Sequence, residues 1–250
     1  MTAALRTKQL RKSFGALQVA KDINFSLDQG ARHALIGPNG AGKSTFVNLL
    51  SGTLKPTGGK VYIGDVDVTN ASPASRVNRG LARTFQINSL FNQMTVTENV
   101  ALAVSARLKS DGGLWRNPVR QPELQREVDR LLDMVDLTSV ATKRISEISY
   151  GQRRLVEIAL ALALKPSVLL LDEPAAGLPK SSSERLLELL VRLPRETAIL
   201  IIDHDMDIVF GFADTVTVMF QGGILVEGKS GEIKSNALVR EVYLGNARHA

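Results

Sequence analysis

The stretch Gly37-Pro38-Asn39-Gly40-Ala41-Gly42-Lys43-Ser44-Thr45 fits the phosphate-binding pattern G-x-x-x-x-G-K-S/T without a gap. The apolar residues 34–36 before it predict a buried strand, and the apolar residues of 46–50 after it predict the inward face of a helix. A strand, a loop and a helix in this order form the context that the pattern requires. The stretch therefore predicts an α/β nucleotide-binding core.

Each part of this loop suits a polyphosphate. Gly37, Gly40 and Gly42 let the backbone curl so that successive N–H groups point into one concavity at the positive end of the helix. Lys43 is expected to reach the β- and γ-phosphates, and the Ser44 hydroxyl is expected to bind Mg²⁺. The alternative is a Gly-rich turn before a core helix. We predict a nucleoside triphosphate as the ligand.

The composition is that of one globular nucleotide-binding domain with an inserted or appended lobe. The 250 residues are 44% hydrophobic and 22% charged, which is ordinary for a large core. No cysteine occurs, so disulfides and thiolate metal sites are excluded, as suits a reducing cytoplasm. The sequence contains neither a bilayer-length apolar run nor an export signal, so we expect the protein to stay inside the cell.

The basic charge of the chain bears on its partners. The formal net charge is +6 and the isoelectric point is near 9.7. Basic residues are scattered along the sequence, whereas nucleic-acid sites gather them with aromatic residues in one stripe. We therefore expect no nucleic-acid partner and regard the charge as mild support for proximity to a membrane.

Two acids follow a second apolar run. Residues 168–171 predict a buried strand, and Asp172 and Glu173 stand at its carboxyl end, where a doubly wound sheet places its chemistry. Asp172 fits the acid that holds Mg²⁺ through water, and Glu173 fits the base that deprotonates the attacking water. Since adjacent strand residues point to opposite sides, the two acids should have separate roles. The alternative is a pair of acids in an ordinary turn.

Four further residues each allow a functional interpretation and a purely structural one. Phe14 could stack on an adenine or simply pack, and Gln86, the last residue of the predicted strand 81–86, would by itself hydrogen-bond a turn. Ser149 is in helix-capping position, where its hydroxyl and the first free N–H groups present a second anion site; the alternative is an ordinary capped helix. His204, after the predicted strand 198–202, could donate a hydrogen bond to a γ-phosphate or have only a structural role.

The remaining pattern outlines the fold. Residues 5–36 predict short strands, and residues 61–68 predict a hairpin around a Gly-Asp turn. Residues 72–80 predict a short exposed helix with Arg76 and Arg79 on a solvated face. Residues 96–164 predict a helical lobe, with a loop-like insert between Lys109 and Gln121. We predict an α/β core with a mixed parallel sheet, an antiparallel β edge subdomain and an inserted α-helical subdomain.

The ordered set of motifs resembles the ATP-binding subunit of an ABC transporter across almost the whole chain. Subunits of this family are P-loop NTPases. Gly37 to Thr45 resembles the Walker A loop, Val168 to Glu173 resembles Walker B, and Ser149-Tyr150-Gly151-Gln152 resembles the signature motif, with Tyr150 where Gly is commoner. The resemblance implies a single domain over residues 1–250, with the nucleotide-binding core at 1–86 and 166–250 and a helical subdomain at about 87–165.

The resemblance also implies roles for individual residues. Catalysis falls to Glu173, the switch histidine His204 and the Q-loop glutamine Gln86. Mg²⁺ is held by Ser44, Gln86 and Asp172. ATP is bound by Phe14, Gly37, Asn39, Gly40, Ala41, Gly42, Lys43, Ser44 and Thr45, and across a subunit interface by Ser149, Gly151 and Gln152.

Within that superfamily, several segments resemble the branched-chain amino acid uptake branch, among them residues 83–86, 95–100 and 242–245. ATPases for urea, amide or lipopolysaccharide transport share much of this pattern and remain alternatives. Pro179 stands where many relatives have Asp or Asn; it lacks a polar side chain and an N–H, so that cross-subunit contact must be weaker or made differently.

The resemblance implies partners and a location. They are transmembrane permease subunits, a second identical or related ATPase subunit, and indirectly a substrate-binding protein, at the cytoplasmic face of the inner (plasma) membrane as a peripheral subunit. Rival classes are a soluble ABC ATPase acting on ribosomes or DNA, a P-loop kinase or GTPase, and a weakly catalytic regulatory subunit. The signature and His204 oppose the kinase or GTPase, and the intact Lys43 and Glu173 oppose the regulatory subunit.

Overall fold

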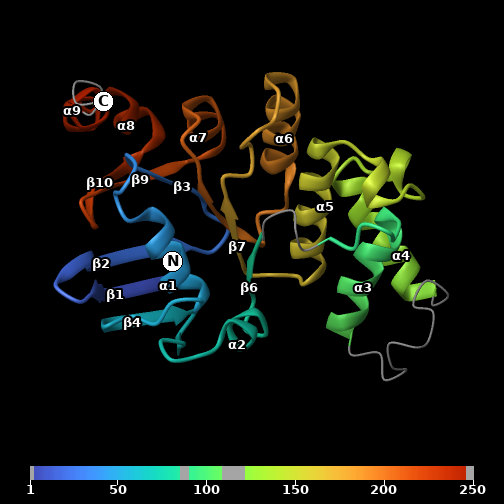
Figure 1. Ribbon diagram of the computed structural model, residues 1–250, viewed down its shortest axis with the longest axis horizontal. Coiled ribbons are helices and arrows are strands. Elements are labelled where there is room, and N and C mark those ends of the chain that lie inside the picture. The colour runs from blue at the N-terminus through green and yellow to red at the C-terminus, as the bar shows by residue number, and fades with distance from the viewer. Residues whose placement is uncertain (1–2, 85–89, 109–121, 246–250) are drawn as a thin grey trace. The chain divides into compact units, whose positions relative to one another are not determined.

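The computed structural model describes residues 3–84, 90–108 and 122–245. Its contacts divide the chain into two compact units (Figure 1), one made of Met1–Arg83, Ser167–Ala176 and Pro194–Ala250, and the other of Thr84–Pro166 and Gly177–Leu193. This division adds residues 177–193 to the helical part that the sequence places at about 87–165. That both units act as a single ATPase domain stays a prediction.

The first unit contains a six-stranded mixed sheet. Its strand order is β10-β9-β3-β8-β7-β6, in which β10 is antiparallel to β9 and the other neighbours are parallel. The bounds are β3 (Arg32–Ile36), β6 (Leu81–Arg83), β7 (Val168–Asp172), β8 (Ala198–Ile202), β9 (Thr215–Phe220) and β10 (Gly223–Lys229). The predicted buried strands at 34–36, 168–171 and 198–202 are therefore confirmed.

A separate antiparallel sheet belongs to the same unit. Its order is β2-β1-β4-β5, with β1 (Ala3–Phe14), β2 (Leu17–Asp28), β4 (Gly58–Ile63) and β5 (Val66–Asp67). The last two strands form the hairpin predicted at 61–68, in which Ile63 pairs with Val66. The α/β class, the mixed sheet and the antiparallel subdomain are all confirmed.

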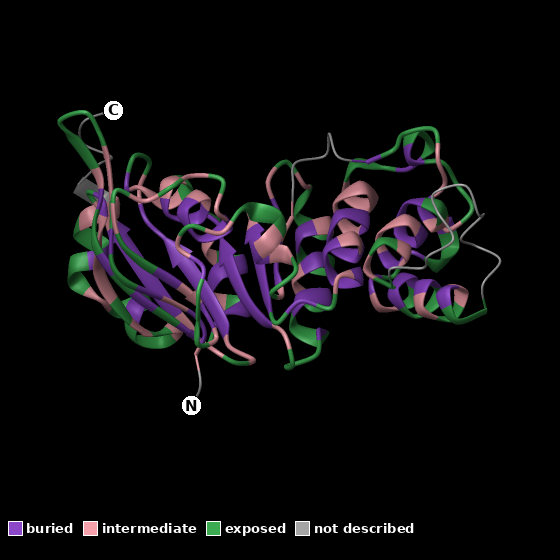
Figure 2. Cartoon of the chain, turned by 90° about the horizontal axis from the view of Figure 1, so that it is seen from below, coloured by how far each residue is buried: buried purple, intermediate pink, exposed green. Residues whose placement is uncertain are grey.

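The hydrophobic core explains why the chain adopts this arrangement. Helix α1 (Lys43–Ser51) buries Phe46, Val47, Leu49 and Leu50 completely, as their spacing predicts. These side chains form one cluster with residues of β1, β2 and β4 and with alternate residues of β7 and β8. Strands β3 and β8 are buried along their whole length, as expected for parallel strands covered on both faces. Figure 2 shows several strands of the chain in the colour of buried residues. The remaining helices of the unit are α2 (Pro73–Val77), α7 (Met206–Phe212), α8 (Ser230–Ser235) and α9 (Ala237–Gly245).

The second unit is helical. It contains α3 (Val96–Leu108), α4 (Pro122–Met134), α5 (Tyr150–Ala163) and α6 (Lys180–Arg192), with two short 3₁₀ turns at Thr138–Val140 and Ile145–Glu147. Helix α4 is amphipathic, with Val128, Leu131 and Leu132 buried. The insert expected between 109 and 121 lies outside the described residues. Among residues 3–84, 90–108 and 122–245, no helix has the length and apolar character needed to cross a membrane.

The prediction that Arg76 lies on a solvated face is wrong. Its side chain is 1% exposed and donates hydrogen bonds of 2.6 Å to the carbonyl oxygens of Leu49 and Leu50 and of 3.0 Å to that of Thr69. The carbonyls at the end of α1 have no partner within the helix, so a buried guanidinium supplies one. Arg76 therefore anchors α2 to the end of the helix that follows the phosphate loop.

A buried histidine in β3 makes stability depend on pH. His33 is 3% exposed, with its Nε2 2.7 Å from Thr217 Oγ1 and 3.9 Å from Glu227 Oε2. Burial lowers the pKa of His33 from 6.5 to about 4. Because the unfolded chain takes up this proton first, acid favours unfolding, and the loss of stability begins as the pH falls below the unfolded-state pKa.

We expect the free energy of unfolding to fall by about 1.4 kcal/mol between about pH 7.5 and about pH 5.5 through His33 alone. Urea denaturation at both pH values measures this change. The variant His33→Gln should lose that part of the pH dependence, whatever its baseline stability. Equal slopes for the variant and the wild type would contradict the assignment.

Candidate functional site

The phosphate loop joins β3 to α1, and its backbone has the conformation that only glycine adopts easily. Gly42 precedes the first residue of α1 with φ 100°, and no side chain caps the helix at this position. The first N–H groups of α1 are therefore left for a ligand. At Gly37 an added Cβ would collide with the carbonyl oxygen of Met219, so any side chain would clash with the backbone. Both glycines are required by the path of the loop.

A cleft of about 570 Å³ in the first unit brings the loop and the two acids together. Asp172 and Glu173 line it with Asn39, Gly40, Ala41, Gly42, Lys43, Ser44 and Thr45. The cleft is also lined by residues to which sequence reasoning gave no role in the site, namely Leu17, Gln18, Val19, Lys21, Ile202, Gln221 and Gly222. The turn after β9 is tied to the loop, because the N–H of Gly222 donates to the carbonyl of Ala41 at 3.0 Å.

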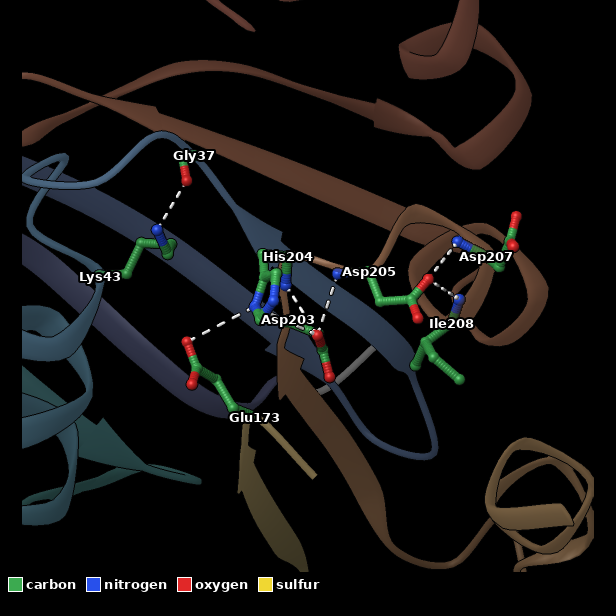
Figure 3. Close-up of polar contacts among 8 residues, drawn as sticks. All are labelled: Gly37, Lys43, Glu173, Asp203, His204, Asp205, Asp207 and Ile208. Atoms are coloured by element: carbon green, nitrogen blue, oxygen red, sulfur yellow. Dashed lines mark hydrogen bonds and ion pairs between the residues drawn. The ribbon is translucent and has the colours of Figure 1, made fainter. Parts of the chain in front are cut away.

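Lys43 is held against its own loop. Its Nζ donates a hydrogen bond of 2.6 Å to the carbonyl of Gly37 (Figure 3) and one of 3.1 Å to the carbonyl of Pro38. Burial lowers the pKa of Lys43, while the nearby carboxylates of Glu173 and Asp172 raise it in part. Lys43 and the two acids thus line the same cleft, where a polyphosphate would supply further negative charge.

The carboxyl end of β7 presents two acids in different surroundings. Asp172 is the last residue of the strand, and its Oδ2 accepts a hydrogen bond of 2.7 Å from Arg83. Glu173 has φ 47°, a left-handed conformation that is uncommon for a residue with a side chain. Its N–H donates to the carbonyl of Ile202 at 2.7 Å, and its side chain is 51% exposed. Such strain at a cleft supports a functional role for Glu173.

His204 lies beside Glu173 at the end of the neighbouring strand β8. Its Nδ1 is 3.7 Å from Glu173 Oε1 (Figure 3), and its side chain is 71% exposed. Asp203, which is 2% exposed, holds this segment, since its Oδ1 accepts the backbone N–H groups of His204 at 2.8 Å and Asp205 at 3.0 Å. Asp205 in turn caps α7. The fold therefore places the predicted base and the predicted switch histidine side by side.

The predicted roles of Phe14 and Gln86 are not tested by the structure. Phe14 is 53% exposed at the end of β1, with the Nζ of Lys12 5.0 Å from its ring centre, and it is not among the residues that line the cleft. Its stacking role stays a prediction. Gln86 lies outside the described residues, so its roles in catalysis and Mg²⁺ binding also stay predictions.

The signature residues belong to the second unit. The Oγ of Ser149 accepts from the N–H of Gln152 at 3.3 Å, and Gln152 Oε1 accepts from the N–H of Ser149 at 2.9 Å. This capping box confirms the helix-capping position predicted for Ser149. Ser149, Gly151 and Gln152 line a cavity of about 220 Å³. The signature helix therefore presents its amino end at a cavity of its own unit.

Sequence reasoning missed two residues that hold the acids and the histidine in place, Arg83 and Asp203. A signal for Asp203 was available, because an aspartate side chain often accepts a hydrogen bond from the backbone N–H two residues further on, here that of Asp205. No local signal pointed to Arg83, since its partner lies 89 residues further along the chain.

The match to a known family rests on more than the phosphate loop. The model of the ABC transporter family, whose members share this ATP-binding fold, matches residues 20–176, and the chain belongs to this family. Among curated proteins, the chain is 36% identical to the high-affinity branched-chain amino acid transport ATP-binding protein LivG of Escherichia coli (strain K12), over 97% of this chain and 98% of that protein.

Solved structures agree with this assignment. The ADP conformation of MJ1267, an ATP-binding cassette of an ABC transporter, superposes with a TM-score of 0.84 at 32% identity over 98% of this chain and 100% of that one. The ATP-binding cassette MJ0796, in a dimeric post-hydrolysis state bound to ADP and Pi, superposes with a TM-score of 0.74 at 25% identity over 90% of this chain and 98% of that one. The protein is thus an ATP-binding ABC ATPase.

Proposed function

We propose that this protein is the ATP-hydrolysing subunit of a membrane transporter that imports branched-chain or related amino acids. The observation that carries the proposal is the single cleft that contains the phosphate loop, Asp172 and Glu173. The full-length similarity to LivG supports the amino acid cargo. Urea, amides and lipopolysaccharide remain alternative cargoes, because the cargo would contact other subunits.

The residues of the cleft fit ATP and Mg²⁺. The uncapped N–H groups at the start of α1 and the ammonium of Lys43 are suited to phosphate oxygens. Ser44 and Asp172 would hold Mg²⁺, since hydroxyl and carboxylate oxygens are its preferred donors. When bound, Mg²⁺ neutralises charge on the β- and γ-phosphates. Gln86 is proposed as a further oxygen donor from the family resemblance alone.

The residues of the site would have separate roles in ATP hydrolysis. Glu173 would accept the proton of the attacking water as general base. His204, whose Nδ1 is 3.7 Å from Glu173 Oε1, would orient that carboxylate and donate to the γ-phosphate. Lys43 would exchange its bonds to the loop carbonyls for bonds to phosphate oxygens. Phe14 would stack on the base.

We infer that two copies, or one copy and a related subunit, bind ATP between them. In each site the signature residues Ser149, Gly151 and Gln152 of one copy would complete the contacts of the phosphate loop of the other. The dimeric cassette MJ0796 supports this arrangement. A ligand shared by two surfaces favours the closed dimer, and loss of the γ-phosphate removes that contact, so hydrolysis would reopen it.

The partners follow from this role. We propose that transmembrane permease subunits bind this ATPase at the cytoplasmic face of the inner membrane, with a substrate-binding protein acting indirectly. We also propose that the two units of the chain work as a single ABC ATPase domain, because the phosphate loop lies in one and the signature motif in the other.

The proposal is tested by affinity-tagging the chain, isolating it from native membranes and measuring ATP-dependent uptake of radiolabelled leucine by vesicles that contain the complex. We expect multi-span membrane proteins to co-purify and uptake to require ATP. Lys43→Ala should abolish both ATP hydrolysis and uptake, whereas the matched control Lys8→Ala, at an exposed lysine of β1, should leave both unchanged. Uptake of urea or amides but not of leucine would contradict the cargo, and co-purification of ribosomes or DNA without membrane proteins would contradict the transport function.

A further inference from the structure

Arg83 makes a network that connects the end of β7 with the helix after the phosphate loop. It is the last residue of β6, and its Nη2 donates to Asp172 Oδ2 at 2.7 Å. Its Nη1 donates to Asn48 Oδ1 at 2.7 Å and to Ser51 Oγ at 3.4 Å, both on α1. The side chains of Arg83 and Asp172 are only 17% and 27% exposed, so this ion pair is shielded from water more than a surface pair.

The contacted residues of α1 lie on the same face of the helix as Ser44. Ser44, Asn48 and Ser51 are separated by four and then three residues, and such spacing places side chains above one another along a helix. Arg83 therefore joins the helix face that contains Ser44 to the carboxylate of Asp172. These are the two described residues to which we assign Mg²⁺.

Strand register explains how a residue so distant in sequence reaches this position. Arg83 pairs with Leu170 in the parallel ladder between β6 and β7. Because side chains alternate along a strand, Asp172 points to the same face of the sheet as Leu170. Arg83 and Asp172 thus lie on the face of the sheet against which α1 packs, so the network links β6, β7 and α1.

We propose that Arg83 is a positioning residue for the Mg²⁺ site: it fixes Oδ2 of Asp172 and ties that carboxylate to the Ser44 face of α1. The proposal rests on the proposed function, in which Asp172 and Ser44 hold the ion. A guanidinium with donors in a fixed fork suits this bridge, since it can bond a carboxylate with one nitrogen and an amide oxygen with the other. Arg83 orients a carboxylate that binds the metal and does not itself contact the substrate.

The test measures Mg²⁺ dependence separately from hydrolysis. Binding of a fluorescent ATP analogue is titrated with Mg²⁺ and repeated in excess EDTA, for the wild type and for Arg83→Ala. We expect the variant to require about tenfold more Mg²⁺ for half-maximal tightening, the size of one lost charge-assisted hydrogen bond. Its affinity for the analogue in EDTA should stay within about twofold of the wild type, because the phosphate loop itself is unchanged.

Three further variants separate an effect of Arg83 on Asp172 from a general loss of positive charge or of folding. Arg79→Ala, at an exposed arginine, should leave the Mg²⁺ titration unchanged. In an Asp172→Asn background, removing Arg83 should have no further effect on Mg²⁺, since the group that it positions is already altered. If Arg83→Ala does not fold, as judged by thermal unfolding, Arg83→Lys gives the same readout: it retains the charge but lacks the second donor nitrogen of the guanidinium fork, so we expect a smaller rightward shift.

The possible outcomes are distinct. An unchanged Mg²⁺ titration, a tighter one, or an equal loss of affinity with and without Mg²⁺ would each overturn the role of Arg83. A rightward shift confined to Mg²⁺ and absent in the Asp172→Asn background would support it. Wild-type protein that binds no ATP analogue under any condition would instead contradict the proposed function, and this proposal with it.

Discussion

Replacing Glu173 with Gln is expected to slow ATP turnover by about 10²–10⁴-fold, the usual contribution of a general base. Glutamine has nearly the same shape but cannot accept the proton of the attacking water at neutral pH. ATP binding should persist, because it depends on the phosphate loop and on Lys43. Steady-state phosphate release and equilibrium nucleotide binding, measured on the same preparation, separate the two effects.

The matched control for this variant is Glu188→Gln, at an exposed position of α6 outside the cleft. It should retain the parental rate. Hydrolysis at the parental rate in Glu173→Gln would show that another group takes the proton, and loss of nucleotide binding would show that the variant perturbs the phosphate loop instead.

Replacing Ser149 with Arg is expected to abolish ATP-driven dimerisation and to leave ATP binding by the monomer intact. The change places a long cation at the amino end of α5, where the Ser149 hydroxyl caps the helix and is proposed to meet the γ-phosphate of a second copy. Its effect within the unit is modest, since loss of a cap costs about 1 kcal/mol. Its effect at the interface is large, because the arginine would occupy the volume of the bound phosphate.

Light scattering with and without ATP measures this prediction, best in the Glu173→Gln background, in which ATP is not consumed. Ser149→Thr is the matched control, because threonine keeps the capping hydroxyl, and it should still dimerise. A dimer that forms unchanged in Ser149→Arg would remove the signature helix from the interface.

Much of the fold could be predicted because its signals are local. The continuous apolar run 168–171 and the apolar residues of 46–50 after the phosphate loop each form a local pattern, and both the strand and the helix form where predicted. Arg76 was assigned wrongly because a charged residue in a short polar stretch usually faces water. Its burial depends on carbonyl groups at the end of α1, more than 20 residues away, as in its bond to Leu49 at a separation of 27 residues.

The residues of the site likewise divide into those with a local sequence signal and those positioned by long-range contacts. The phosphate loop, the two acids and the capping position of Ser149 are contained in short patterns, so the sequence alone placed them. The hydrogen bond from Arg83 to Asp172 spans 89 residues and depends on the register of β6 against β7, which no short pattern encodes. The turn at Gln221-Gly222 reaches the cleft only because β9 lies next to β3 in the sheet.

The central claim is that ATP completes its contacts between two copies of the chain or between one copy and a related subunit. The most direct measurement is an experimental structure of Glu173→Gln determined with Mg²⁺ and ATP. We predict that the γ-phosphate contacts Lys43 of one copy and the Ser149 position of the other. A triphosphate enclosed entirely by a single molecule, with Ser149 of every copy remote from it, would contradict the account.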